Sequence, residues 1–232
     1  MLNPNPQAAV PQDVSIEARE LTKDHPLPIV TVFALPKPFG GKADLIQRNA
    51  IQSWAALKPD VEVILLGDEA GIKETAEEFG VRHVSGLRCN EHGTPLLDSA
   101  FRLAHQETTT AYLAYCNCDV ILTSDFPDAI HQLARESHFP QFVAFGQRTD
   151  LNVDREIDFQ QPIQAERLRQ ECQAKGVPAS NVCKEYFIFS RQLYQHIPPF
   201  AVGRGNWDNW MIHSAKKTKV PVVNMSKMVT AI

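Results

Sequence analysis

The chain has 232 residues, of which 44% are hydrophobic and 22% are charged, and its net charge is −4 at pH 7. This length and composition predict one domain with a sizeable core. The longest basic run is Lys216-Lys217, so a nucleic-acid partner is not expected. No apolar run reaches the roughly 18 residues that a membrane span needs, so no membrane span is expected either.

The N-terminus and the cysteines bear on where the protein works. Residues 1–28 lack the basic and apolar regions of a signal peptide, and three prolines fall within the first eleven residues. We therefore predict a disordered lead-in over 1–28. The five cysteines fit no zinc-binding spacing, and free cysteines are usually small buried core residues. These features favour reduced thiols and a cytoplasmic location.

Hydrophobic patterning over the first 150 residues predicts strands that alternate with helices. The predicted strands are apolar and rich in β-branched residues, and they span 29–36, 61–67, 81–86, 111–122 and 142–148. The predicted helices carry apolar residues at helical spacing, and they span 42–57, 71–80, 95–106 and 126–137. Such alternation predicts an α/β fold with a Rossmann-like, mostly parallel sheet flanked by helices.

The pattern changes after residue 150. We predict a helix over 163–176, a strand over 185–190, an irregular Pro-, Gly- and Trp-rich segment that becomes helical towards 217, and a last strand or strand pair over 220–232. This C-terminal half is expected to add an antiparallel edge to the same sheet. The sequence therefore predicts a single domain over 29–232, built from the halves 29–150 and 151–232.

The end of the strand predicted over 111–122 carries polar side chains where a ligand is expected. In open α/β sheets, ligands bind beyond the carboxyl ends of the strands. Asn117 and Asp119 alternate with Cys118 on this strand, so both are expected to point to one side. Their oxygen atoms suit Mg²⁺ or Mn²⁺, which are often held by one or two carboxylates together with phosphates and water. A purely structural alternative stays open, in which Asp119 caps a turn and Asn117 satisfies backbone groups.

A second unusual stretch is GRGNWDNWMI, residues 203–212. Trp207 and Trp210 are three residues apart, so on a helix they share a face. They are either a packed aromatic anchor or a platform for a sugar ring, with Asp and Asn side chains binding its hydroxyls. In the second interpretation, Asp208 is a candidate general base towards an acceptor hydroxyl.

These motifs occur together with several others in one order along the chain. The segments are TVFALPKPF (31–39), QRNAIQSWAAL (47–57), VILLGDE (63–69), HGTPLLDSAF (92–101), YCNCDVIL (115–122), EYFIFS (185–190) and IPPFAVGRGNWDNWMI (197–212). The combination resembles glycosyltransferase-like proteins of the GT-A fold, the nucleotide-diphospho-sugar transferase superfamily, over roughly residues 28–232. NCDVIL is similar to a variant of that fold's D-x-D motif, and GRGNWDNW is similar to a C-terminal signature of the group.

The resemblance implies a hexosyltransferase-like enzyme that uses Mn²⁺ or Mg²⁺. It would move a sugar from a UDP- or GDP-sugar to a glycan or another hydroxyl acceptor, with inversion or retention left open. Residues 29–150 would be the nucleotide-binding half, and 151–232 the acceptor-side half. The implied donor-binding residues are Ala34, Leu35, Pro36, Lys37, Arg48, Asp68, Gly93, Thr94, Asn117 and Asp119, and the last two would also hold the metal. The implied acceptor-binding residues are Glu185, Arg204, Trp207, Asn209 and Trp210, with Asp208 as the catalytic base.

Three departures from the family pattern keep other functions open. Asn117 and Glu185 both stand where the group usually has Asp. The chain ends at MVTAI, where relatives continue into a His-containing segment that completes the metal site, so His92 and His213 are the candidate replacements. A non-catalytic nucleotide- or glycan-binding protein is one alternative. A sugar nucleotidyltransferase is another, although PKPFGGK (36–42) only weakly matches its glycine-rich basic loop.

Overall fold

The structure is a computed structural model that describes residues 28–136, 139–180, 182–204 and 206–232. The lead-in predicted over 1–28 therefore lies outside the described residues, apart from Pro28. Within the described ranges, no helix is long and apolar enough to cross a membrane.

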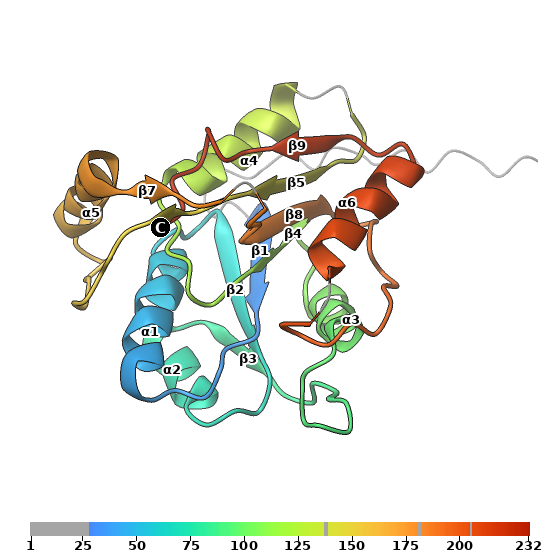
Figure 1. Cartoon of the computed structure of the whole chain (residues 1–232), viewed down its shortest axis with the longest axis horizontal. Helices are drawn as coiled ribbons and strands as arrows, with labels where there is room; N and C mark the ends of the chain where they lie inside the picture. Colours follow the sequence, from blue (N-terminus) through green and yellow to red (C-terminus); the bar gives the residue numbers. More distant parts are fainter. Residues whose placement is uncertain (1–27, 137–138, 181, 205) are drawn as a thin grey trace, which may run out of the picture.

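A seven-stranded sheet forms the centre of the molecule (Figure 1). In spatial order its strands are β3 (Arg82–Val84), β2 (Val61–Leu66), β1 (Val30–Ala34), β4 (Tyr112–Cys116), β8 (Tyr186–Ser190), β5 (Val143–Gly146) and β9 (Val222–Asn224). All its pairings are parallel except the two that β8 makes with β4 and β5. A two-stranded antiparallel sheet joins β6 (Thr149–Asp150) to β7 (Val177–Pro178).

The predicted fold class is confirmed, with one difference in the place of the antiparallel strand. β8 comes from the C-terminal half, as expected, but it lies inside the sheet between β4 and β5 rather than at an edge. The edge strand β9 is parallel to its neighbour β5. Apolar periodicity predicts a strand but not its neighbours, because pairing depends on residues far apart in the chain. Strands from both predicted halves thus share one sheet.

Helices cover both faces of the sheet (Figure 1). These helices are α1 (Gly41–Ala55), α2 (Ile72–Phe79), α3 (Leu97–Glu107), α4 (Asp125–Glu136) and α6 (Trp207–Lys217), whereas α5 (Pro162–Lys175) lies in the smaller lobe described below. One core lies under α1, α2 and α4 and contains Val32 and Trp54. The opposite core lies under α3 and α6 and contains Phe33 and Phe101. Val32 and Phe33 fall in different cores because successive side chains of a strand point to opposite faces.

A smaller lobe packs beside the end of the sheet. Helix α5 contributes Leu168 and Cys172 to a third apolar cluster, which also contains Ile121 and the C-terminal Ile232. Backbone hydrogen bonds join Ile121 and Ile232 in both directions, at 2.8 and 3.0 Å. The last residues of the chain therefore lie directly beside the segment that follows β4 (Figure 1).

β4 ends earlier than predicted. The strand stops at Cys116 rather than near residue 122, and residues 117–122 turn away from the sheet. The Val120 amide donates to the Asn117 carbonyl at 3.2 Å, which closes the turn. Side chains of α1 hold the rest of the segment: Trp54 Nε1 donates to the Val120 carbonyl at 2.9 Å. The apolar run 120–122 is thus buried against a helix rather than paired in the sheet.

The helix predicted over 95–106 also begins later, at Leu97. Pro95 was expected in its first turn, but it instead makes an antiparallel bridge with Cys89. The other helices form close to their predicted bounds, and α2 ends at Gly80 in the left-handed conformation that suits a glycine C-cap.

Gly146, the last residue of β5, is expected to tolerate no side chain. Its partner across the sheet is Tyr186, whose ring is fully buried. A Cβ built at position 146 would lie 1.9 Å from the Tyr186 hydroxyl oxygen. We expect Gly146→Ala to lower the free energy of unfolding by about 1–3 kcal/mol, the usual cost of overpacking a core. Urea unfolding followed by circular dichroism measures this change.

Gly40→Ala is the matched control. Position 40 has nothing within 4 Å of a built Cβ, and its φ of 164° is extended backbone that any residue adopts. The control should change the free energy of unfolding by no more than about 0.5 kcal/mol. Equal effects of the two substitutions would show that Tyr186 moves aside.

Candidate functional site

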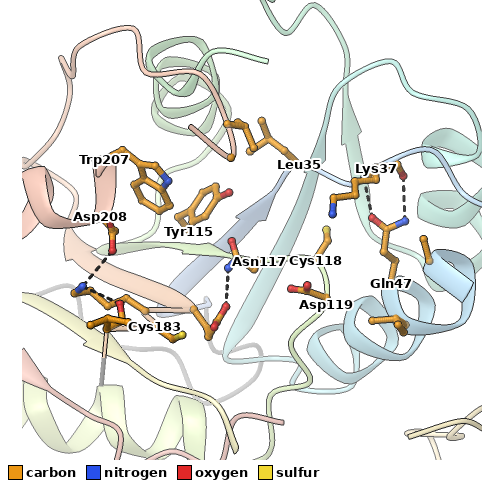
Figure 2. A pocket seen from close by; sticks show the side chains of 17 residues that line it. Leu35, Lys37, Gln47, Tyr115, Asn117, Cys118, Asp119, Cys183, Trp207 and Asp208 are labelled. Carbon is orange, nitrogen blue, oxygen red and sulfur yellow. Dashed lines mark hydrogen bonds and ion pairs between the residues drawn. The ribbon is translucent and has the colours of Figure 1, made fainter. Parts of the chain in front are cut away.

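A cavity of about 480 Å³ opens at the carboxyl ends of β1 and β4 (Figure 2). Its walls come from the segments after these two strands, from α1, from the residues that lead into β8, and from the start of α6. The lining residues are Leu35, Lys37, Ala43, Ile46, Gln47, Tyr115, Asn117, Cys118, Asp119, Val182, Cys183, Lys184, Glu185, Val202, Gly203, Trp207 and Asp208. The position agrees with the rule for open α/β sheets.

Many of the predicted site residues line this one cavity. They are Leu35, Lys37, Asn117, Asp119, Glu185, Trp207 and Asp208. Figure 2 shows Asn117 between two groups: Trp207 and Asp208 lie on one side, and Lys37 and Asp119 lie on the other. Residues from both predicted halves of the chain thus meet in one place.

Some of the predicted donor-binding residues lie at a smaller neighbouring cavity of about 140 Å³. Pro36 and Asp68 line it, and Leu35 lines both cavities. The predicted residues Gly93 and Thr94 belong to the turn before Pro95, which lines the small cavity as well. Ala34 does not reach either cavity, because it is completely buried in β1.

Four other predicted residues lie outside the main cavity. Arg48 makes an ion pair with Glu78 on α2 and stacks over the Phe79 ring at 5.0 Å. Arg204 is exposed. Trp210 packs against the Phe200 and Tyr194 rings, with 5.6 and 6.2 Å between ring centroids. Asn209 is exposed and accepts a hydrogen bond from Lys184 at 3.1 Å.

The Asp119 end of the cavity offers oxygen atoms to a cation. Asp119 is exposed, and no described residue donates to its carboxylate. Asn117 Nδ2 donates a hydrogen bond to Glu185. The other end of the Asn117 amide, the oxygen Oδ1, has no partner among the described residues. The two residues follow β4 in a turn, so the strand alternation expected from the sequence is not what brings them together.

The donor set fits a cation only in part. Among the described residues, no group of three or more His, Cys, Asp and Glu side chains could hold a metal ion. Mg²⁺ and Mn²⁺ accept carboxylate and amide oxygens, and they are often held by one carboxylate together with phosphates. Asp119 and Asn117 therefore fit an ion that is shared with a bound diphosphate. His92 and His213 are exposed and do not line the cavity, so neither adds a ligand to a cation at Asp119.

The opposite end of the cavity is formed by the first turn of α6. Lys184 Nζ donates to Asp208 Oδ2 at 3.1 Å, and the Lys184 side chain is only 10% exposed. The Trp207 indole packs against the Tyr115 ring, with 4.9 Å between ring centroids. Trp207 thus lines the cavity beside a carboxylate that an ammonium group holds in position.

Comparison with solved structures shows a shared architecture. Glucosyl-3-phosphoglycerate synthase from Mycobacterium tuberculosis, in complex with Mn²⁺, UDP and phosphoglyceric acid, matches 88% of this chain and 70% of its own, with 18% identity and a TM-score of 0.51. Its complex with Mn²⁺, UDP-glucose and phosphoglyceric acid matches 88% and 71%, with the same identity and TM-score. The chain has a GT-A-type fold. No protein-family model matches the sequence, and no curated protein matches it either.

Polar residues of α1 hold the backbone of segments around the cavity, and the sequence interpretation missed them. Gln47 brackets the segment after β1: its Oε1 accepts from the Lys37 amide at 2.7 Å, and its Nε2 donates to the Lys37 carbonyl at 3.0 Å. Asn49 binds the backbone of Arg155 and Ile157 in the same two-sided way. Ser53 Oγ accepts from the Leu122 amide at 3.1 Å.

All three α1 residues are buried, whereas Ile46 of the predicted apolar face is 42% exposed. The only signal in the sequence was the presence of polar residues inside an otherwise apolar helix. Lys184 was missed as well, because nothing in the local pattern marks a lysine whose partners lie elsewhere in the chain.

The five cysteines are free thiols, as predicted, and their reactivities are expected to differ. Burial raises the pKa of both the Cys116 thiol and the Cys118 thiol. The negative charge of Asp119 raises the pKa of Cys118 further. The thiolate is the reactive form, so at pH 8 we expect both to react with iodoacetamide at least about tenfold more slowly than exposed Cys89. Mass spectrometry of tryptic peptides measures the rates.

The rate at which Cys183 is labelled in the same experiment reports whether a nucleotide occupies the main cavity. Its side chain is half-buried and lines the main cavity, so UDP with Mn²⁺ should slow its labelling if a nucleotide occupies the cavity. The rate at Cys89 should change much less. Rapid labelling of Cys116 in the folded protein would contradict the described packing.

Proposed function

We propose that this protein is a divalent-metal-dependent glycosyltransferase that moves a sugar from a nucleotide-diphospho-sugar to a hydroxyl acceptor. One observation carries the proposal: a single cavity in a GT-A-type fold has two carboxylates at opposite ends, Asp119, which has no partner among the described residues, and Asp208. The M. tuberculosis synthase supports this function, since its structures hold UDP or UDP-glucose with Mn²⁺. UDP- or GDP-sugars are the proposed donors, and a glycan or another hydroxyl compound is the proposed acceptor.

At the donor end, Asp119 and Asn117 Oδ1 would hold Mn²⁺ or Mg²⁺. Such an ion supplies positive charge that stabilises a leaving diphosphate. Lys37 adds an ammonium group, which Figure 2 shows directed into the cavity toward Cys118, and Nζ has no hydrogen bond or ion pair with the part of the chain described. Gln47 fixes the Lys37 backbone. The small cavity lined by Pro36 and Asp68 would receive the nucleoside.

At the acceptor end, Asp208 would take a proton from the acceptor hydroxyl. Lys184 binds Oδ2, while Oδ1 accepts no hydrogen bond from the described residues and is available to the acceptor. In a single displacement, the acceptor oxygen bonds to the anomeric carbon as the bond from that carbon to the diphosphate oxygen breaks. The diphosphate leaves with the bonding electrons, and the proton goes to Asp208. Trp207 would contact the apolar face of a sugar ring.

The first test is nucleotide binding. Thermal unfolding and calorimetry would be measured with UDP, GDP, CDP and their glucose or mannose conjugates, each with and without MnCl₂. A ligand at a hundred times its Kd should stabilise the folded state by about 2.7 kcal/mol. We expect one nucleotide to stabilise the protein strongly only with Mn²⁺. Lack of any response to the whole panel would overturn the proposed function.

A non-catalytic GT-A-like binding protein is the second candidate. The observation that favours it is the incomplete donor set: the first ligand position is an amide, and the described residues contain no cluster of three metal-binding side chains. The two candidates differ in turnover. Release of UDP from UDP-sugar in a panel of hydroxyl acceptors supports the transferase, whereas tight binding with no release from any acceptor supports the binding protein.

A further inference from the structure

Glu185 is a buried carboxylate at the floor of the cavity, and both of its oxygens have partners. Its side chain is 6% exposed. Oε2 accepts a hydrogen bond from Asn117 Nδ2 at 2.7 Å, and Oε1 forms an ion pair with Arg148 Nη1. Arg148 is held in turn, because its Nε donates to Asp150 Oδ1 at 2.7 Å. The family resemblance implied that Glu185 binds the acceptor, but in the structure its side chain contacts Asn117, a predicted donor-binding residue.

The backbone of Glu185 is fixed on both sides. Its amide donates to the Gly146 carbonyl at 2.9 Å, and its carbonyl accepts from the Asn117 amide at 3.0 Å. These bonds extend the pairing of β8 with β5 and β4 by one residue. The Glu185 side chain therefore has little freedom to move, because its backbone is fixed and its two carboxylate oxygens are held by Asn117 and Arg148.

This arrangement decides which way the Asn117 amide faces. A carboxylate only accepts hydrogen bonds, so the NH₂ group of Asn117 must be the end that meets Glu185. The oxygen Oδ1 then lies on the opposite side of the amide from Glu185, in a residue that lines the same cavity as Asp119. An aspartate at position 117 would instead place a carboxylate against the Glu185 carboxylate, an arrangement that like charges disfavour.

We propose that Glu185 is a positioning residue of the donor site: with Arg148 on its other side, it holds Asn117 so that Oδ1 faces the cavity as a ligand for the metal–diphosphate unit. This inference rests on the proposed function, since it assigns the metal-bound nucleotide to the same cavity. Residues 117 and 185 therefore form a matched pair in which one side chain is an amide and the other a carboxylate. The amide and the carboxylate can exchange places, but neither residue can change alone.

Glu185→Gln tests the proposal with an isosteric change. Arg148 requires the glutamine oxygen, which turns the glutamine NH₂ towards the NH₂ of Asn117, so Asn117 must flip and present a donor to the cavity. We expect UDP affinity in MnCl₂ to fall about 10–100-fold, the usual effect of changing a group that orients a metal ligand, while the weaker metal-free affinity changes little. Calorimetry measures both affinities, and thermal unfolding checks that the variant is folded.

The matched control is Glu171→Gln on α5. Glu171 also pairs with an arginine, Arg155, at 2.6 Å, but it lies outside the cavity. This variant should bind UDP as the unchanged protein does.

Asn117→Asp alone should weaken Mn²⁺-dependent binding, whereas Asn117→Asp combined with Glu185→Gln should restore it to within about threefold. In the double variant, the glutamine NH₂ faces the aspartate and its oxygen faces Arg148.

The outcomes separate the two proposals. If the unchanged protein binds UDP with Mn²⁺ and Glu185→Gln binds it equally well, the role of Glu185 is overturned and the proposed function stands. If Glu185→Gln lowers the metal-free and metal-dependent affinities by the same factor, or the double variant is weaker than both single variants, Glu185 is only structural. If the unchanged protein binds no nucleotide of the panel, the proposed function and the role of Glu185 both fall.

Discussion

Asp119→Asn is expected to remove the Mn²⁺-dependent part of nucleotide binding. Asp119 is the one carboxylate on the donor side of the cavity that has no partner among the described residues, whereas Glu185 is fully engaged. Without it, the only remaining ligands would be amide oxygens, which carry no net charge to attract a divalent cation. We expect UDP affinity in MnCl₂ to fall at least about a hundredfold, since even indirect partners of a metal ligand contribute 10–100-fold. Calorimetry with and without MnCl₂ measures the change.

Asp128→Asn on α4 is the control for charge. Asp128 is exposed and lies outside the cavity, so this variant has the same net charge as Asp119→Asn but keeps the donor site. It should retain Mn²⁺-dependent binding. Retention of that binding by Asp119→Asn as well would show that the metal uses other groups, and the structural alternative for Asn117 and Asp119 would then hold.

Asp208→Asn is expected to stop sugar transfer while sparing the donor. Asparagine keeps an oxygen for Lys184 Nζ, so the first turn of α6 should stay in place, but an amide cannot take the acceptor proton. We expect kcat to fall about 10²–10⁴-fold, the usual contribution of a general base, with UDP affinity in MnCl₂ nearly unchanged. The measurements are UDP release from the donor found in the nucleotide panel and calorimetry with UDP.

Asp98→Asn provides the control for Asp208. Asp98 also lies in the first turn of a helix, α3, and pairs with a basic side chain, Arg88, but it does not line the cavity. Transfer should be unchanged in this variant. Intact transfer by Asp208→Asn would show that another group is the base. Loss of UDP binding by Asp208→Asn would place Asp208 at the donor end instead.

The periodic features of the fold could be predicted from the sequence. Alternating apolar strands and helices predicted the parallel α/β sheet, because side-chain period is a local property that a short window of residues reveals. The strand ends then indicated where a ligand would bind. The resemblance of NCDVIL and GRGNWDNW to family motifs added residues on both sides of the cavity, and Asp119, Trp207 and Asp208 do line it.

The sequence by itself thus determined the kinds of elements, their order and the region of the site. Only the tertiary structure decided that β8 lies inside the sheet, that β4 stops at Cys116, and that Glu185 accepts a hydrogen bond from Asn117. Asn117 and Glu185 are 68 residues apart, and the lysine that holds Asp208 is 24 residues away from it. Such pairs leave no periodic trace, because their hydrogen bonds form only after strand pairing has brought distant parts of the chain together.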